Sequence, residues 1–155
     1  MARPAFVESN ISMPLAQNWL FWALGSAIFA ALTAVFAKVG VAGVDSTLAT
    51  LIRTLIVVPL AAGVAWFTGA LQAPSIPGRT WIFLLLSGAG AGASWLCYFR
   101  ALQLGDVGRV APVDKLSLVL VAMFAAVFLG ETLSWRNWLG IGFVVAGVIL
   151  IAIRD

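Results

Sequence analysis

The stretch that decides the fold is residues 110–129, which read VAPVDKLSLVLVAMFAAVFL. The uncharged segment that follows Lys115, Leu116–Gly130, is too short to cross a bilayer comfortably, because the hydrocarbon core needs about 20 residues of helix. A membrane-spanning helix must therefore begin earlier, at residues 111–112, where the proline suits the first helical position because it has no N–H to leave unpaired. That start places Asp114 in the first turn and carries it, with Lys115, into the interface or just below it.

Four further apolar runs accompany this one, and none alternates as a membrane β-strand does. The chain is 63% hydrophobic and 10% charged, whereas soluble domains are about 25% charged. We therefore predict an all-α membrane protein with five transmembrane helices. The predicted spans are residues 19–37, 46–71, 81–99, 110–129 and 133–153. Residues 1–16 are expected to form an N-terminal tail, and residues 17–153 a single five-helix domain.

Tryptophans and charges gather at opposite ends of the predicted spans. Five spans place the termini on opposite sides, so we name the N-terminal side A and the C-terminal side B. The tryptophans near side A, where indole rings anchor a chain in the headgroup layer, are Trp19, Trp22, Trp66, Trp81, Trp135 and Trp138. Basic residues are in slight excess near side B, which points weakly to that side as cytoplasmic. Without Arg53 and Lys115, which lie within helices, the two sides are nearly balanced, and such a chain can insert either way up.

Composition also excludes several kinds of chemistry. The chain has no histidine, so it lacks the commonest general base and neutral metal ligand. A single cysteine, Cys97, cannot form an internal disulfide. The net charge of +3 is carried by scattered basic residues, and this predicts no nucleic-acid surface. No cofactor or metal is expected, and the expected partners are the lipid bilayer and a small-molecule solute.

Seven side chains toward side B are candidates for lining a substrate pathway, because charges at such depth usually face a bundle interior or a water-filled cavity. They are Arg53, Asp114, Lys115, Trp95, Tyr98, Arg100 and Lys38. We expect Arg53, about two turns inside its span, to pair with Asp114 or Asp45. Structural roles are the alternatives: Asp114 complementing a helix dipole, the lysines snorkelling to headgroups, Arg100 anchoring its helix, and the aromatic rings packing.

Several motifs occur in an order that is typical of one transporter family. They are Tyr98-Phe-Arg-Ala-Leu, Gly105-Asp106, Ala111-Pro112 with Asp114-Lys115-Leu-Ser117, and Leu129-Gly-Glu131. Over residues 17–153 the chain resembles the EamA domain of the drug/metabolite transporter superfamily. The resemblance implies five helices that form half of a ten-helix inverted-repeat transporter in the bacterial inner membrane. The resemblance also implies that Asp114 and Lys115 are site residues.

Because the chain supplies only half of such a ten-helix transporter, the resemblance implies a partner. A homodimer, antiparallel or parallel, is the simplest arrangement. The small-residue segment Gly88–Ser94 predicts a close helix crossing or a cavity wall. Related small multidrug proteins carry a membrane-embedded glutamate in their first helix, whereas residues 19–37 contain no acid, so proton coupling of that kind does not carry over. Two other functions stay open: an enzyme acting on a lipid head group, and a non-transporting membrane assembly subunit.

Overall fold

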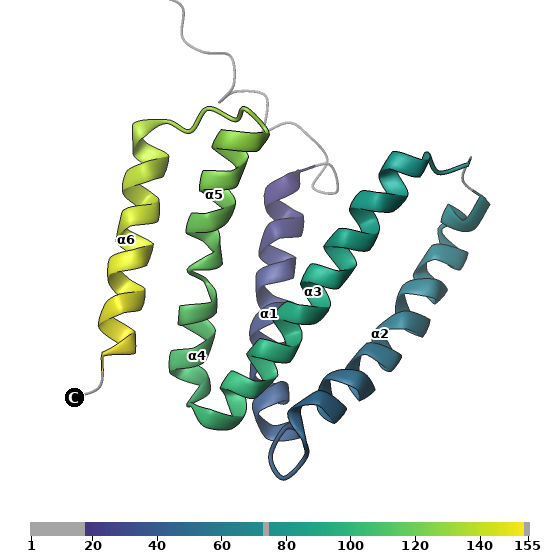
Figure 1. Ribbon diagram of the computed structural model, residues 1–155, viewed down its shortest axis with the longest axis horizontal. Coiled ribbons are helices and arrows are strands. Elements are labelled where there is room, and N and C mark those ends of the chain that lie inside the picture. Colours follow the sequence, from purple (N-terminus) through teal and green to yellow (C-terminus); the bar gives the residue numbers. More distant parts are fainter. Residues whose placement is uncertain (1–17, 73–74, 154–155) are drawn as a thin grey trace, which may run out of the picture. The chain divides into compact units, whose positions relative to one another are not determined.

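The computed structural model describes residues 18–72 and 75–153, and within them the regular structure is entirely helical. The elements are α1 (Trp19–Gly40), α2 (Ser46–Phe67), the short η2 (Ala70–Gln72), α3 (Gly78–Leu104), α4 (Val107–Asp114), α5 (Ser117–Phe128) and α6 (Trp135–Ala152) (Figure 1). Five segments are long and apolar enough to cross a membrane, with α4 and α5 together forming the fourth. The predicted all-α membrane protein is confirmed. The predicted tail lies outside the described residues.

The helix ends differ from the predicted ones in two informative places. The second span ends at Phe67 rather than at residue 71, because Gly69 takes a φ of 72° that stops the helix. The fourth span begins at Val107, earlier than the predicted start near residues 111–112. Asp106 occupies its N-cap position, so Pro112 lies inside a helix instead of opening one.

Contacts divide the chain into two units, Met1–Phe36 and Ala37–Asp155. The described part of the first unit is one uncharged helical segment, residues 19–36. In the second unit, α2 packs along α3, α4 contacts both α3 and α6, and α5 contacts α6. The second unit therefore contains every contact on which the site below depends.

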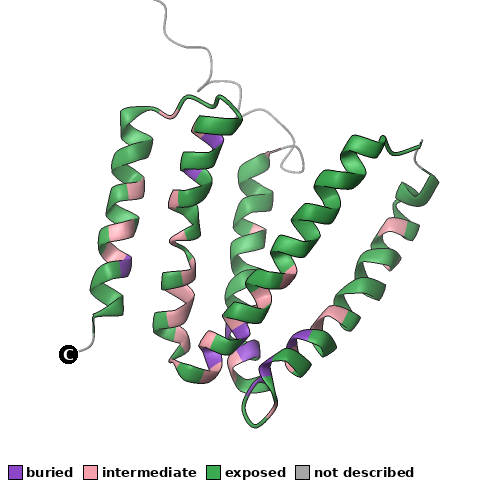
Figure 2. Cartoon of the chain, in the orientation of Figure 1, coloured by how far each residue is buried: buried purple, intermediate pink, exposed green. Residues whose placement is uncertain are grey.

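The small core of the second unit lies at side B. Ala37, Val41, Phe99 and Leu102 form a buried cluster, and Leu102 is completely buried. Figure 2 shows this buried group where the last turn of α1, the start of α2 and the end of α3 meet. Side B is thus where the helices of this unit are fastened together.

Most of the surface of the spans is exposed. Only 6–11% of each apolar window is buried inside the chain, and a Cβ added to Gly88, Gly90 or Gly92 would meet no heavy atom within 4 Å. The predicted close crossing at this segment is therefore absent from the described chain, although Gly92 and Ser94 do line pockets. Lipid or another protein must cover these faces.

Candidate functional site

The fourth span is broken where the candidate acid lies. Pro112 has no N–H for the carbonyl of Gly108, and its ring crowds that carbonyl, so the α-helical ladder is interrupted. Backbone bonds of the i→i−3 kind follow, from Lys115 N–H to the Pro112 oxygen and from Leu116 N–H to the Val113 oxygen, both 3.0 Å. Such tight turns inside a helix often mark functional sites. Asp114 is the last residue of α4, so its predicted place in a first turn was wrong.

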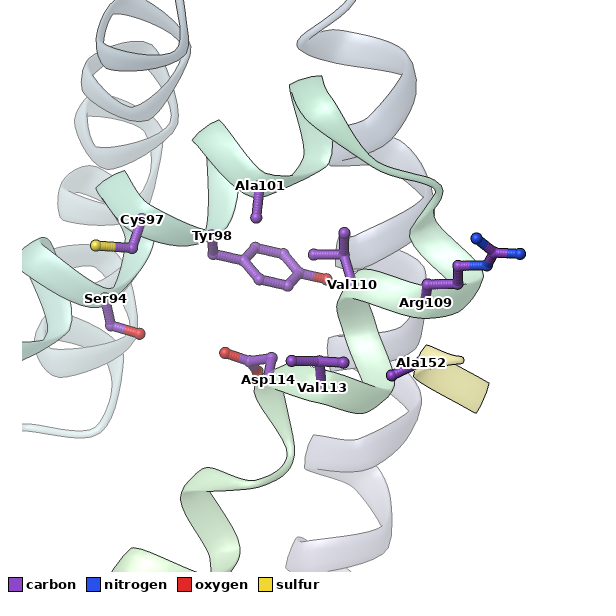
Figure 3. A pocket seen from close by; sticks show the side chains of 9 residues that line it. All are labelled: Ser94, Cys97, Tyr98, Ala101, Arg109, Val110, Val113, Asp114 and Ala152. Atoms are coloured by element: carbon purple, nitrogen blue, oxygen red, sulfur yellow. The ribbon is translucent and has the colours of Figure 1, made fainter. Parts of the chain in front are cut away.

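A pocket of about 360 Å³ adjoins this break. Its lining comes from α3, α4 and the C-terminal end of α6. The lining residues are Ser94, Cys97, Tyr98, Ala101, Arg109, Val110, Val113, Asp114 and Ala152. In Figure 3 the Tyr98 ring extends into the space between α3 and α4, and the Ser94 hydroxyl faces the Asp114 carboxylate across it. The pocket thus combines one carboxylate with an aromatic ring and mostly apolar walls.

Asp114 is paired with its neighbour in sequence. The Lys115 ammonium lies 3.0 Å from a carboxylate oxygen of Asp114, and the two side chains are 61% and 35% exposed, respectively. This is the one ion pair that the structure shows within the described residues. Lys115 itself does not line the pocket. The break therefore carries a carboxylate that faces the pocket and a lysine that neutralises it from outside.

Arg53 has aromatic neighbours instead of the predicted acidic partner. Its guanidinium carbon lies 4.3 Å from the ring centroid of Trp95 and 5.5 Å from that of Phe99. Stacking on these rings attracts the guanidinium through their quadrupoles and lets its charge sit partly buried between α2 and α3. The expected pairing with Asp114 or Asp45 was wrong. Neither Arg53 nor Trp95 lines the Asp114 pocket.

Lys38 fastens the end of α3. Its ammonium donates to the carbonyl oxygens of Leu102 at 2.7 Å and Gly105 at 2.8 Å. These carbonyls belong to the last turn, which has no intrahelical donors, and a cation there also complements the helix dipole. Lys38 therefore donates hydrogen bonds to free carbonyls at the end of α3, instead of snorkelling to headgroups.

Arg100 takes part in a second fastening at side B. Its guanidinium donates to the side-chain oxygen of Gln103 at 3.0 Å, and the Gln103 amide donates to the Val44 carbonyl at 2.6 Å. The end of α3 is thereby tied to the loop before α2. Arg100 and Lys38 line a different pocket, of about 450 Å³, at this end. The seven candidates thus fall into separate groups, of which Asp114 and Tyr98 share one pocket.

Asp45 is a helix cap. One of its carboxylate oxygens accepts from the Thr47 N–H at 2.8 Å and the Leu48 N–H at 3.1 Å. These bonds, that of Leu48 first, lower the pKa of the Asp45 carboxyl below its ordinary value. This role explains why Asp45 is not available to Arg53.

Sequence reasoning missed most of the pocket wall. Ser94, Cys97 and Ala101 share one face of α3 with Tyr98, at spacings of three, four and seven residues. Ser94 ends the small-residue segment predicted as a possible cavity wall, and extending that face from Tyr98 could have found Cys97 and Ala101. On α4, Asp114 was a predicted candidate, whereas the other wall residues of α4 and α6 carried no such signal, since they depend on how those helices pack.

Five apolar spans, one of them broken beside a pocket, define a multi-pass membrane protein. The model of the EamA-like transporter family matches residues 17–153, and the chain belongs to that family. The chain is 61% identical over 140 residues to an uncharacterized transporter in the cobO 3' region of Sinorhizobium sp., covering 90% of this chain and 99% of that protein.

More distant relatives are probable flippase subunits for 4-amino-4-deoxy-L-arabinose-phosphoundecaprenol, called ArnE. The subunit from Aeromonas hydrophila is 32% identical over 69 residues, which is 44% of this chain and 60% of that protein. The one from Pseudomonas fluorescens is 31% identical over 72 residues, or 46% and 61%. The chain thus spans about three fifths of these subunits. No solved structure matches it.

Proposed function

We propose that this chain moves a small metabolite or drug across the bacterial inner membrane by alternating access, as a homodimer. The observation that carries the proposal is the Asp114 pocket, which adjoins a break in a membrane-spanning helix. Non-helical backbone and a carboxylate are tolerated at membrane depth where they line a cavity or are buried in protein. A pathway for a solute would account for both the helix break and the carboxylate.

The dimer is proposed because one chain leaves its spans uncovered. Each apolar window is at most 11% buried, and glycines of α3 and α6, such as Gly90 and Gly140, have open space beside them. The family resemblance implies ten helices, which two copies would supply. Cysteine labelling at each terminus, in a Cys97→Ser background, tests the arrangement. Labelling of both termini from both faces would mean dual insertion and support an antiparallel pair, whereas strict one-sided labelling would exclude that arrangement.

Transport itself is tested with purified protein in liposomes and a labelled panel of amines, amino acids and sugar phosphates. We expect counterflow of at least one class, and a loss of about tenfold or more in Asp114→Asn, because that change removes the charge while keeping the shape. Asp106→Asn is the matched control, since Asp106 makes no side-chain capping bond and lies outside the pocket. Absence of counterflow for the whole panel would contradict the proposal.

A second candidate is a subunit of a lipid-linked sugar flippase. The ArnE relatives are described as subunits of such a flippase, and this agrees with an assembly role for a five-span chain. The distinguishing result is a stable complex with a second membrane protein that survives purification, together with no counterflow by the purified chain alone. An enzyme acting on a lipid head group would instead leave a chemically altered lipid.

A further inference from the structure

We propose that the Asp114 pocket binds a compact organic cation with an apolar body, and that Lys115 is a built-in counter-ion which the bound cation displaces. The inference rests on the proposed transport function and names its substrate class. It begins with the charge distribution. Among the described residues that line the pocket, Asp114 is the single acid, and its carboxylate faces the interior (Figure 3).

The two neighbouring cations are placed so that the Asp114 carboxylate is the charged group turned toward the pocket interior. Arg109 contributes to the lining, but its guanidinium points away from Asp114 in Figure 3. Lys115 is 61% exposed and reaches Asp114 from outside the lining. An anion entering the pocket would be repelled by the Asp114 carboxylate, whereas a cation would form an ion pair with it.

The Asp114–Lys115 pair is built to be exchanged. Pairs this exposed contribute little net stability, because solvent screens the attraction and the lysine stem loses freedom. The ammonium donates to no other group in the described chain, so its release leaves no protein carbonyl unsatisfied. Pairing with Lys115 also compensates the carboxylate near the membrane, where an unpaired charge is costly. A bound cation would take over that role.

The rest of the wall selects for size and an apolar body. The volume of about 360 Å³ falls at the lower end of small-molecule sites. Apart from Asp114, Ser94 and Arg109, the wall consists of the Tyr98 ring, the Cys97 thiol and small or branched apolar side chains. Because an aromatic face attracts a cation, the pocket suits an ammonium head carrying an alkyl or aryl group.

The test uses three ligands of one shape: benzyltrimethylammonium, its neutral isostere neopentylbenzene, and the anion phenylmethanesulfonate. Binding to the purified protein in detergent is measured by titration calorimetry, and protection of Cys97 from a maleimide locates the ligand, since Cys97 lines the pocket. We expect the cation to bind at least tenfold more tightly than the other two. Asp114→Asn should remove that preference, and Asp106→Asn should keep it.

Lys115→Gln should change the affinity for the cation in the opposite direction from Asp114→Asn, because it removes the competing counter-ion. It should tighten cation binding several-fold, and this arm decides the question even if Asp114→Asn does not fold. Equal binding of all three ligands, preference for the anion, or weaker cation binding in Lys115→Gln would overturn the inference.

Liposome flux of the same cation separates the proposed cation site from the proposed transport function. Binding without flux contradicts the transport function and leaves the cation site standing, whereas flux that does not depend on Asp114 contradicts the site.

Discussion

The two ends of the second unit are built on different principles. At side B, Val41 and Leu102 are 2% and 0% exposed, and side chains such as Lys38 close onto backbone carbonyls. At side A, Trp66 and Trp135 are 75% and 68% exposed. In lipid such exposure costs little, because acyl chains are as apolar as the side chains. One end is thus held by protein contacts, and the other is left to the bilayer or a partner.

The difference assigns separate tasks to the charges at side B. Lys38, Asp45 and Arg100 belong to the fastening of helix ends, and Arg53 is held against aromatic rings. Asp114 takes no part in this fastening, and its carboxylate lines the pocket between α3, α4 and the end of α6. This end supports a binding site through direct contacts between its helices, since α4, which carries Asp114, packs against both α3 and α6.

The largest effect on stability is expected from Leu102→Ala. This change opens a cavity in the side-B core, where Leu102 is completely buried. We expect a loss of about 2–3 kcal/mol in the free energy of unfolding, the lower part of the soluble-protein range, because lipid also solvates the unfolded segment. SDS titration of the detergent-solubilised protein measures it. Leu86→Ala on the same helix is the control, since Leu86 is 63% exposed. Equal losses would contradict the special contribution of the buried cluster around Leu102.

A smaller loss is expected from Lys38→Met. The change keeps the apolar stem but leaves the carbonyls of Leu102 and Gly105 without their donor, which costs about 1–2 kcal/mol in the free energy of unfolding. Lys115→Met is the matched control, because its exposed pair contributes about 0–1 kcal/mol. The same SDS titration compares them. If both variants lost equal stability, Lys38 would be no more than an interfacial lysine.

The sequence predicted the spans well because membrane helices are set by length and apolarity alone. The break in the fourth span was visible as Pro112 beside Asp114, yet was interpreted as a helix start. Composition could not show that Asp106 opens the helix at Val107, because the residues after it include Gly108 and Arg109, which are not typical of a span.

The site was predicted less completely, because depth in the membrane does not specify a partner. Asp114 and Tyr98 were both predicted to lie toward side B, and the structure brings them to one pocket. Arg53 was expected to pair with an acid because opposite charges attract. The packing of α2 on α3 instead places its guanidinium against the Trp95 ring. Lys38 binds carbonyls at the end of a helix, a partner that no side-chain pattern records.

The smallest effect is a pH dependence carried by Asp45. Bonds from the Leu48 and Thr47 N–H groups lower the pKa of its carboxyl in the folded protein. Its contribution is therefore fully present above the unfolded-state pKa, about 3.9, and is lost as the pH falls through the lower folded-state value. The unfolding midpoints of the wild type and Asp45→Ala should differ at pH 6 and converge as the pH falls below 4. Asp106→Ala, which removes an N-cap residue without a side-chain capping bond, should show no such convergence. If the Asp45→Ala deficit kept its full size at low pH, the cap would act through packing instead of charge, and side B would be fastened by Lys38, Gln103 and the core alone.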